Sequence, residues 1–408
     1  MIMNDDLDKN VMHVKDPSMG LSRAIQRMDE EVPPINKIPM VKRHFTKLPP
    51  LPALPAKQKN ALLDLDSDLK TFLTKREVRT LVVGVGGAGN NMTSRFQQML
   101  LPGCRTLCVN TDVQDLYYSN ADEKILIGKQ LTKGLGAGND HQMGELAALE
   151  DYDRLVHLLD ADIVFLTCGL GGGTGTGATP LIAKAAKESG AMVISIATMP
   201  FKMEGITKER IAFQGLKNLA DHSDTTIPLS NQKLISLVPN IKIHQGFKIM
   251  DEILIRSVKG IINLITKPGL VNLDFADIQS IIKRKSQALE DAMYSTSVIG
   301  MTEVSKFSDN HLKHYTVKAL DNPLIEPEIG DIKNALVGIA GDSSVKLKQV
   351  DTVVATVSEK IHPDANLKWG FISDNNLNGK MRITVMGHGF KSPVLEKAIM
   401  ADYTTAFT

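Results

Sequence analysis

The segment from Cys168 to Pro180 combines six glycines with three threonines and directly follows the apolar run ADIVFLT. Glycine in a helix interior is destabilising by roughly 0.5–1 kcal/mol relative to alanine, so regular secondary structure does not account for so dense a cluster. Bare backbone lets successive N–H groups converge on an anion, and the hydroxyls of Thr174 and Thr176 can donate to the same ligand. The composition therefore predicts a phosphate-binding loop.

A second glycine-rich segment, VVGVGGAGNNM, places Gly84, Gly86 and Gly89 in the pattern G-x-G-x-x-G between a strand-like run and a helix-like run. Asp112 stands at the end of the next strand-like run, as an acidic residue does in dinucleotide-binding folds. This single match fits equally well a dinucleotide site, another phosphate site or a tight structural turn.

Gly134, Gly136 and Gly138 form a third cluster in LTKGLGAGND. A dinucleotide-binding enzyme needs one glycine turn for its pyrophosphate, whereas this chain has three glycine-rich loops after successive strands. Parallel strands all end on one side of a sheet, so we expect the loops to converge on one crevice and to hold several phosphates. The P-loop and the kinase motifs are absent, because no lysine follows the glycines at the required place.

These loops require a sheet to position them. Apolar runs that alternate with helical stretches between about residues 78 and 230 predict parallel strands with helices on both faces. One long helix is expected at about Ile243–Thr266, where apolar residues recur at spacings of three and four until KPG ends it. The predicted fold class is α/β: a parallel Rossmann-like sheet, a long central helix and a second, smaller α+β domain.

The predicted organisation has five parts. The N-terminal extension holds eight of the 18 prolines, which is typical of a mobile tether. The parts are the extension (1–57), the domain with the glycine-rich loops and a leading helix (58–242), the central helix (243–268), the C-terminal α+β domain (269–390) and a short tail (391–408).

Composition excludes several classes of ligand. With 47 basic and 46 acidic side chains the net charge is +1, so nucleic acid and an anionic membrane are not expected partners. No apolar stretch approaches the roughly 18 residues of a membrane span, and the N-terminus does not resemble a signal peptide. The three cysteines lack metal-ligand spacing and are expected to be buried thiols. We therefore expect a cytoplasmic protein.

The run GGGTGTG resembles the signature of the tubulin and FtsZ superfamily of polymerising GTPases. From about Leu81 to Phe390 the chain is similar to FtsZ, and the residues of the motif FKIMDEIL are closer to archaeal than to bacterial members. The resemblance implies a GTPase that assembles head to tail into protofilaments, with GTP or GDP and Mg²⁺ as ligands. Six motifs occur in the family's order: NTDVQDL, LTKGLGAG, GLGGGTGTGATP, PFKMEG, FKIMDEIL and GLVNLDFAD.

The resemblance also implies roles for single residues. Asn110 and Asp112 would lie near the γ-phosphate and Mg²⁺, which phosphates and water would hold without a direct protein ligand. Glu204 would lie at the ribose, with Lys208 where bacterial relatives usually have arginine. We expect valine at Gly173 to block the phosphates and to oppose a positive φ. The phosphates would be held by Gly86, Gly87, Gly138, Gly173, Thr174, Gly175 and Thr176.

The base end can be argued from chemistry as well. Phe247 and Asp251 lie four apart on the long helix and hence on one face, where a ring could stack on a purine and a carboxylate could accept from guanine N1–H and N2–H. From the residues alone, a core phenylalanine and a solvated helix carboxylate are the simpler interpretation. The resemblance implies guanine contacts at both positions and at Asn231, with Asn91 also near the base.

Asp274 and Asp277 in NLDFAD are spaced as caps at the start of a helix, and capping is one interpretation of them. The resemblance implies instead the family's synergy loop, which enters the nucleotide site of the next subunit. Asn272, Asp274 and Asp277 would then be catalytic only across a subunit contact, and a monomer would be nearly inert.

We interpret the chain as an FtsZ-like GTPase of the division site whose main partner is itself, with a membrane-anchoring adaptor as a further candidate partner of the extension. The segment SIIKRKSQALEDAMYSTS is more charged than the family's glycine-rich stretch and is expected to alter filament contacts. One alternative is a cytoskeletal filament for cell shape or positioning, which the sequence does not separate from division. A remote one is an NAD-dependent oxidoreductase, which leaves NLDFAD without a use.

Overall fold

The computed structural model describes residues 78–405 apart from 100–102, 241, 267–268, 283–294, 306, 323 and 326. The predicted extension, the predicted leading helix and most of the charged segment after NLDFAD lie outside the described residues. Contacts divide the chain into two units, and the account below concerns the larger one, Arg76–Leu234 with Ile241–Thr408.

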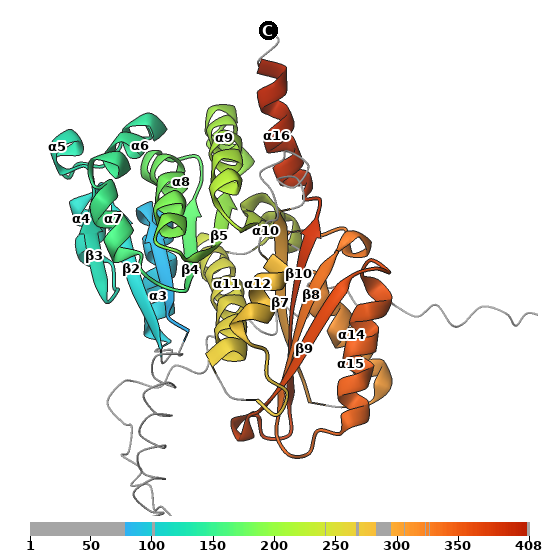
Figure 1. Cartoon of the computed structure of the whole chain (residues 1–408). Coiled ribbons are helices and arrows are strands. Elements are labelled where there is room, and N and C mark those ends of the chain that lie inside the picture. The colour runs from blue at the N-terminus through green and yellow to red at the C-terminus, as the bar shows by residue number, and fades with distance from the viewer. Residues whose placement is uncertain are drawn as a thin grey trace, which may run out of the picture. The chain divides into compact units, whose positions relative to one another are not determined.

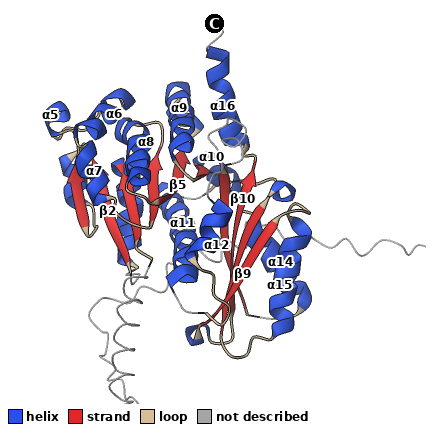
Figure 2. Cartoon of the chain, viewed as in Figure 1, coloured by secondary structure: helices blue, strands red, loops and turns tan. Residues whose placement is uncertain are grey.

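Six parallel strands form one half of the sheet, in the order β3-β2-β1-β4-β5-β6 (Figures 1 and 2). The chain builds outward from β1 through β2 to β3, and then returns to place β4 on the other side of β1. Such a reversal of strand order opens a crevice at the carboxyl ends of the strands. The strands are β1 (Thr80–Val85), β2 (Cys104–Asn110), β3 (Glu123–Leu126), β4 (Ile163–Gly169), β5 (Met192–Met199) and β6 (Thr225–Ser230).

Helices cover both faces of these strands. Alternate residues of a strand point to opposite faces, and in β1 the residues on both faces are buried. Leu81 and Val83 of β1 belong to a buried core shared with the helix that follows β4. Gly84 faces the helix that follows β1, where an added Cβ would lie 2.3 Å from Gly89 O. The helices of this half are α3 (Gly86–Gln98), α4 (Val113–Tyr118), α5 (Lys129–Thr132), α6 (His141–Glu150), α7 (Tyr152–Leu158), α8 (Gly173–Glu188), α9 (Ile206–His222) and α10 (Asn231–Leu237).

The long helix α11 (Ile243–Thr266) contacts α3 on one side and β7, β8 and β10 on the other (Figure 1). The same sheet continues beyond β6 in the order β7-β10-β8-β9, where β10 is antiparallel to both of its neighbours. The elements are α12 (Phe275–Ile282), β7 (Thr296–Val304), α14 (Asp309–Leu320), β8 (Asn334–Gly341), α15 (Leu347–Lys360), β9 (Asn366–Ser373) and β10 (Met381–Phe390). The predicted α/β fold with a smaller C-terminal part is confirmed.

The segment 391–408, expected only as a short tail, contains helix α16 (Pro393–Thr405), and its Leu395 is buried in the same core as α9. Cys108 and Cys168 are free and buried, and burial raises the pKa of their thiols to about 11 and about 12. Over the described ranges, no helix is long and apolar enough to cross a bilayer.

Candidate functional site

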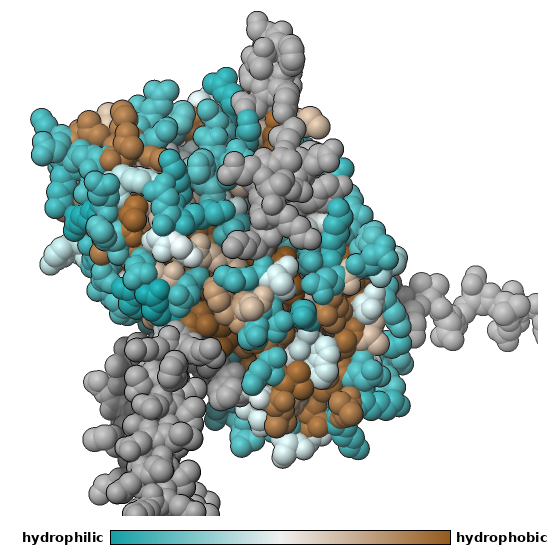
Figure 3. All heavy atoms as spheres, in the orientation of Figure 1, coloured by the Kyte–Doolittle hydropathy of each residue, from teal (hydrophilic) through white to brown (hydrophobic). Residues whose placement is uncertain are grey.

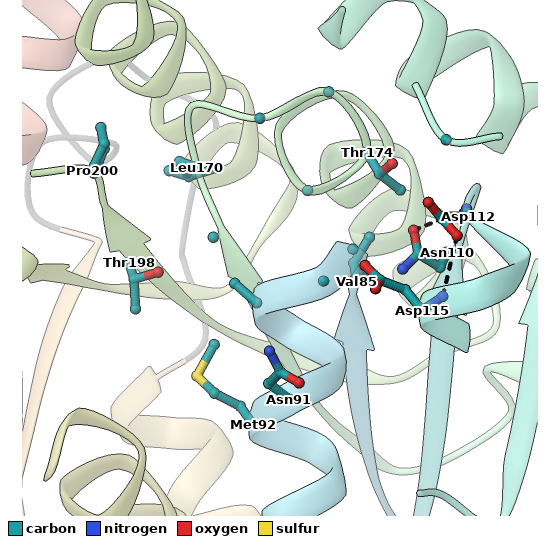
Figure 4. Close-up of a pocket in the computed structure, with 18 of the residues that line it drawn as sticks. Val85, Asn91, Met92, Asn110, Asp112, Asp115, Leu170, Thr174, Thr198 and Pro200 are labelled. Atoms are coloured by element: carbon teal, nitrogen blue, oxygen red, sulfur yellow. Dashed lines mark hydrogen bonds between the residues drawn. The ribbon is translucent and has the colours of Figure 1, made fainter. Parts of the chain in front are cut away.

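The carboxyl ends of β1, β2, β4 and β5 surround a cavity of about 800 Å³, a size typical of small-molecule sites (Figure 4). It lies where the strand order reverses, as the three glycine-rich loops predict. Thirteen of the predicted site residues line it: Gly86, Gly87, Asn91, Asn110, Asp112, Gly138, Gly173, Thr174, Gly175, Glu204, Asn231, Phe247 and Asp251.

The glycine-rich loops approach each other closely because the residues at their contact points are glycines, which have no side chain. Gly86 has a φ of 70°, and an added Cβ there would lie 3.0 Å from Gly175 N. An added Cβ at Gly173 would lie 2.7 Å from the Cβ of Ala137 and 2.8 Å from Asp140 O. Side chains at these positions would separate the loops, so the cavity depends on glycine at both.

The expected positive φ at Gly173 is wrong, because this residue is the first of α8 and its φ is not positive. Close approach of the neighbouring loop excludes a side chain there, not the backbone torsion. As the first residue of a 16-residue helix, Gly173 also begins the run of N–H groups that have no intrahelical acceptor. Together with the helix dipole, these groups attract an anion.

The two threonines of this segment have different surroundings. The hydroxyl of Thr174 lies 2.6 Å from that of Thr111, and Thr174 lines the cavity. Thr176 does not line it, and its Oγ1 accepts from Gly171 N at 2.8 Å. Thr176 therefore shapes the glycine loop from behind.

Acidic and amide groups gather at the end of β2. Asn110 Oδ1 accepts from Asp112 N at 3.3 Å, and Asp112 Oδ1 accepts from Gln114 N at 2.8 Å and from Asp115 N at 3.1 Å as the cap of α4 (Figure 4). Asp115 lines the cavity beside Gly87 and was not predicted. Its position in the first turn of α4, just after the capping Asp112, was the sequence feature that could have placed it beside Asp112 at the site. In the part of the chain that the structure covers, no three His, Cys, Asp or Glu residues are grouped as a metal site.

At the other end of the cavity, Phe247 is 43% exposed and Asp251 only 9% exposed. The interpretation of a core phenylalanine and a solvated carboxylate is therefore wrong at both positions. Phe247 packs edge to face on Phe201, with ring centroids 5.8 Å apart. Asp251 forms an ion pair with Arg95, a cavity residue that the sequence did not reveal. Burial raises the pKa of Asp251 to about 6, and Arg95 opposes this rise.

Glu204 lines the cavity but is held by its neighbours. Its Oε1 accepts from Phe201 N at 2.9 Å, and its Oε2 lies 3.1 Å from Lys208 Nζ. Lys208 itself does not line the cavity. Thr198, Pro200 and Lys248 do so without having been predicted. Nothing in their local sequence distinguishes them, because Lys248 on α11 is distant in the chain from Thr198 and Pro200, and only the fold brings the three residues to one cavity.

Asn272, Asp274 and Asp277 lie outside the cavity. The backbone N–H of Asp277 donates to Asp274 Oδ1 at 2.7 Å, and that of Asp274 donates to Asp277 Oδ2 at 3.3 Å. Reciprocal capping of α12 is thus present within one chain. From Asp251 to the end of α11 at Thr266 the helix rises by about 22 Å at 1.5 Å per residue, so this loop begins far from the cavity.

Comparison with known proteins follows the same division of the chain. The model of the Tubulin/FtsZ family, GTPase domain, matches residues 79–239, and that of the FtsZ family, C-terminal domain, matches residues 295–391. The chain is 42% identical over 333 residues to the cell division protein FtsZ of Methanothermobacter thermautotrophicus. The aligned region covers 81% of this chain and 84% of that protein.

A second relative, cell division protein FtsZ 1 of Thermococcus kodakarensis, is 43% identical over 331 residues, covering 81% of this chain and 86% of that protein. Among solved structures, the empty FtsZ dimer of M. jannaschii has a TM-score of 0.70 at 38% identity, and the match covers 82% of this chain and 93% of that chain. The similarity to archaeal FtsZ that the motifs predicted is confirmed.

Proposed function

The chain belongs to the tubulin/FtsZ family of GTPases, and from this premise we propose that its cavity binds GTP and GDP and that it hydrolyses GTP when subunits assemble head to tail. Family membership replaces the oxidoreductase interpretation of the glycine motif. The observation that carries the proposal is that the loop Asn272–Asp277 lies outside the cavity and begins beyond the far end of α11 within one chain.

The phosphates are proposed to lie against the start of α8 and the two other glycine loops, where backbone N–H groups and Thr174 can donate to them. Asn110 and Asp112 would hold the water shell of a phosphate-bound Mg²⁺, whose charge offsets that of the phosphates. Asp112 Oδ1 already accepts two backbone N–H groups, while Oδ2 lies 3.5 Å from where a Cβ of Gly136 would be, on the cavity side.

Guanine is proposed to stack on the exposed ring of Phe247 and to donate N1–H and N2–H to the carboxylate of Asp251. Asn91 and Asn231 lie at the same cavity and can hydrogen-bond the remaining edge of the base. Glu204 is proposed to accept from the ribose hydroxyls. Buried acceptors that pair with guanine discriminate against adenine, because adenine would leave the carboxylate unpaired.

Hydrolysis is proposed to occur in trans. A subunit whose loop enters the cavity of its neighbour would bring Asn272, Asp274 and Asp277 to the γ-phosphate, where their oxygens can orient and polarise a water molecule. The exposed side chain of Leu270 lies beside this loop, and exposed Met203 and Ile206 follow β5 near Glu204. These apolar groups would be buried in a head-to-tail contact, which favours association.

The biological role is proposed by analogy. The two archaeal relatives are named as cell division proteins, and the M. jannaschii structure is titled a dimer. We infer a cytoplasmic filament at the division site. A filament for cell shape or positioning remains the second candidate, and localisation of the labelled chain in dividing cells separates the two.

The test uses the purified full-length chain with GTP and Mg²⁺. Phosphate release per subunit should rise with protein concentration above a threshold, together with light scattering, because a shared site forms only at contacts. Asp274→Ala should bind GTP normally and hydrolyse it poorly, and adding Gly173→Val subunits, which keep the loop, should restore part of the turnover. Constant specific activity at all concentrations, with Asp274→Ala fully active, would reject the shared site.

A further inference from the structure

The loop before α12 is attached to the outer edge of strand β9, which ends the sheet. Phe371 N donates to Val271 O at 2.9 Å, and Phe371 O accepts from Leu270 N at 2.8 Å. Both backbone groups of Phe371 therefore point away from β8 and toward the loop. An edge strand that would otherwise be open is covered here by the segment that carries Asp274 and Asp277.

Glycines let the loop approach β9 closely. A Cβ at Gly370 would lie 2.8 Å from Leu273 Cγ, and a Cβ at Gly269 would lie 2.4 Å from Phe371 O. Leu273 is 6% exposed, while its neighbours Asn272 and Asp274 are exposed. The buried leucine thus anchors the middle of the loop against the strand and leaves the polar residues on both sides of it facing outward.

One charged side chain of β9 completes the attachment. Lys368 Nζ lies 3.2 Å from Asp277 Oδ1, and the two side chains are 42% and 27% exposed. The other oxygen of Asp277, Oδ2, accepts from Asp274 N. Both oxygens of Asp277 are therefore held within the chain, whereas Asp274 is exposed and its carboxylate is held through Oδ1, which accepts from Asp277 N.

Two carboxylates so close together repel each other unless a cation offsets one of them. The backbone N–H groups of Asp274 and Asp277 each donate to the carboxylate of the other residue, and among the ion pairs of the described residues Lys368 supplies a positive charge at Asp277 and not at Asp274. This arrangement leaves Asp274 as the carboxylate that can turn toward an incoming nucleotide. Figure 3 also shows apolar side chains gathering over the β8–β9 region of the face in view, next to this edge.

We propose that β9 is the platform that holds the loop in its active geometry and that Lys368 is a positioning residue, which acts on Asp274 by fixing Asp277. This inference rests on the proposed hydrolysis in trans. It assigns a role in turnover to a lysine that lies outside the nucleotide cavity and contacts no part of it. It also predicts that the lysine serves the neighbour's GTP and not the subunit's own.

The test compares Lys368→Met, which keeps the length of the side chain without its charge, with Lys368→Arg, which keeps the charge. Lys348→Met is the matched control, because Lys348 on α15 forms an exposed ion pair with Asp309 away from the loop. The assay measures phosphate release per sedimented subunit as a function of GTP concentration, with GTP affinity and thermal unfolding measured in parallel. For Lys368→Met we expect kcat to fall by up to about fivefold, the upper end for a partly exposed ion pair, while KM and GTP affinity stay constant.

Lys368→Arg should recover most of the turnover, and Lys348→Met should match the unmodified chain. In an Asp277→Asn background, which keeps the shape of the side chain without its charge, Lys368→Met should reduce the remaining turnover by less than it does in the unmodified chain, because groups that act through one another are not additive. Unchanged kcat in Lys368→Met, or an undiminished further loss in the double variant, would overturn the inference while leaving concentration-dependent turnover of the unmodified chain intact. Failure of the unmodified chain to bind or hydrolyse GTP would instead reject the proposed function.

Discussion

Arg95 on α3 and Asp251 on α11 form an ion pair at the end of the cavity where guanine is proposed to bind. The carboxylate that would read the base thus already has a cationic partner within the protein. Burial raises the pKa of Asp251 to about 6 although Arg95 opposes the rise, so this carboxyl group changes its charge close to neutral pH. Recognition of the base is therefore expected to depend on pH.

Acidification should weaken GTP binding, because a protonated Asp251 no longer offers two acceptor oxygens to guanine. With a pKa of about 6, about one-tenth of the groups are ionised at pH 5, so this residue alone should reduce affinity up to about tenfold relative to pH 7.5. Calorimetry of Asp251→Asn across the same range measures this component, since protonation of the phosphates affects both proteins equally. We expect Asp251→Asn to bind more weakly at pH 7.5 and to lose less affinity on acidification.

The neighbouring Glu252→Gln is the control, because Glu252 pairs with Arg256 and does not line the cavity. Arg95→Met gives a second test of the same ion pair. Without the guanidinium, burial raises the pKa of Asp251 unopposed, so the loss of affinity should begin at a higher pH. Identical pH profiles for the unmodified chain and Asp251→Asn would show that this carboxylate does not read the base.

The exposed ring of Phe247 should matter for binding and little for folding. Base stacking on an aromatic side chain contributes on the order of 1–3 kcal/mol, so Phe247→Leu should weaken GTP and GDP alike by about 5- to 150-fold. Because Phe247 is 43% exposed, thermal unfolding should hardly change. Phe201→Leu removes the edge-to-face partner but keeps the stacking ring, and it should weaken binding less. Equal affinities in all three proteins would place the base elsewhere.

Adjacent glycines at the start of α8 should respond differently to alanine. A Cβ at Gly173 would approach Ala137 and the backbone of Asp140, whereas a Cβ at Gly172 would have no protein atom within 4 Å. Overpacking typically costs about 1–3 kcal/mol, so Gly173→Ala should lower the free energy of unfolding by this amount and weaken GTP binding. Gly172→Ala should cost less than about 1 kcal/mol in denaturant titrations. Similar losses in both variants would contradict the crowding at Gly173.

The glycine loops, the long helix and the alternation of strands could be predicted because each leaves a local pattern: small residues after strands, or apolar residues at a fixed spacing. Asp112, which was predicted near the γ-phosphate, stands directly before the helix that it caps. Arg95 and Lys368 left no such pattern. Each becomes informative only through an ion pair across elements that are distant in sequence, with Asp251 and Asp277 respectively.

Gly173 illustrates a different limit. Glycine was predicted there for a positive φ, yet the reason for it is the approach of Asp140 from another loop. A sequence shows that a side chain is absent but not which neighbour requires its absence. Thr176 was assigned to the phosphates by the same signature that contains Thr174, and only the fold turns its hydroxyl toward Gly171.

A buried histidine, His388, lies at the junction of the two halves of the sheet, where β6 and β7 are paired at Thr226 and Thr296. We expect it to make the free energy of unfolding depend on pH. His388 is 7% exposed, and its Nδ1 lies 2.9 Å from Ser297 Oγ and 3.2 Å from Thr225 Oγ1. Burial lowers the pKa of His388 from 6.5 to about 4. The folded state therefore keeps this imidazole neutral at a pH where the unfolded chain would protonate it.

Between pH 6.5 and 4 the unfolded state binds the proton of His388 and the folded state does not, so the free energy of unfolding rises with pH across this window. The stabilisation is complete above pH 6.5 and is lost as the pH falls toward 4. From pH 7 to pH 5 the loss should be on the order of 2 kcal/mol, measured by denaturant titration at each pH. His388→Asn should remove this component, whereas His157→Asn, at an exposed position on α7, should retain it. If His388→Asn and the unmodified chain lost the same free energy on acidification, protonation of His388 would not be the cause, and other groups would carry the acid sensitivity.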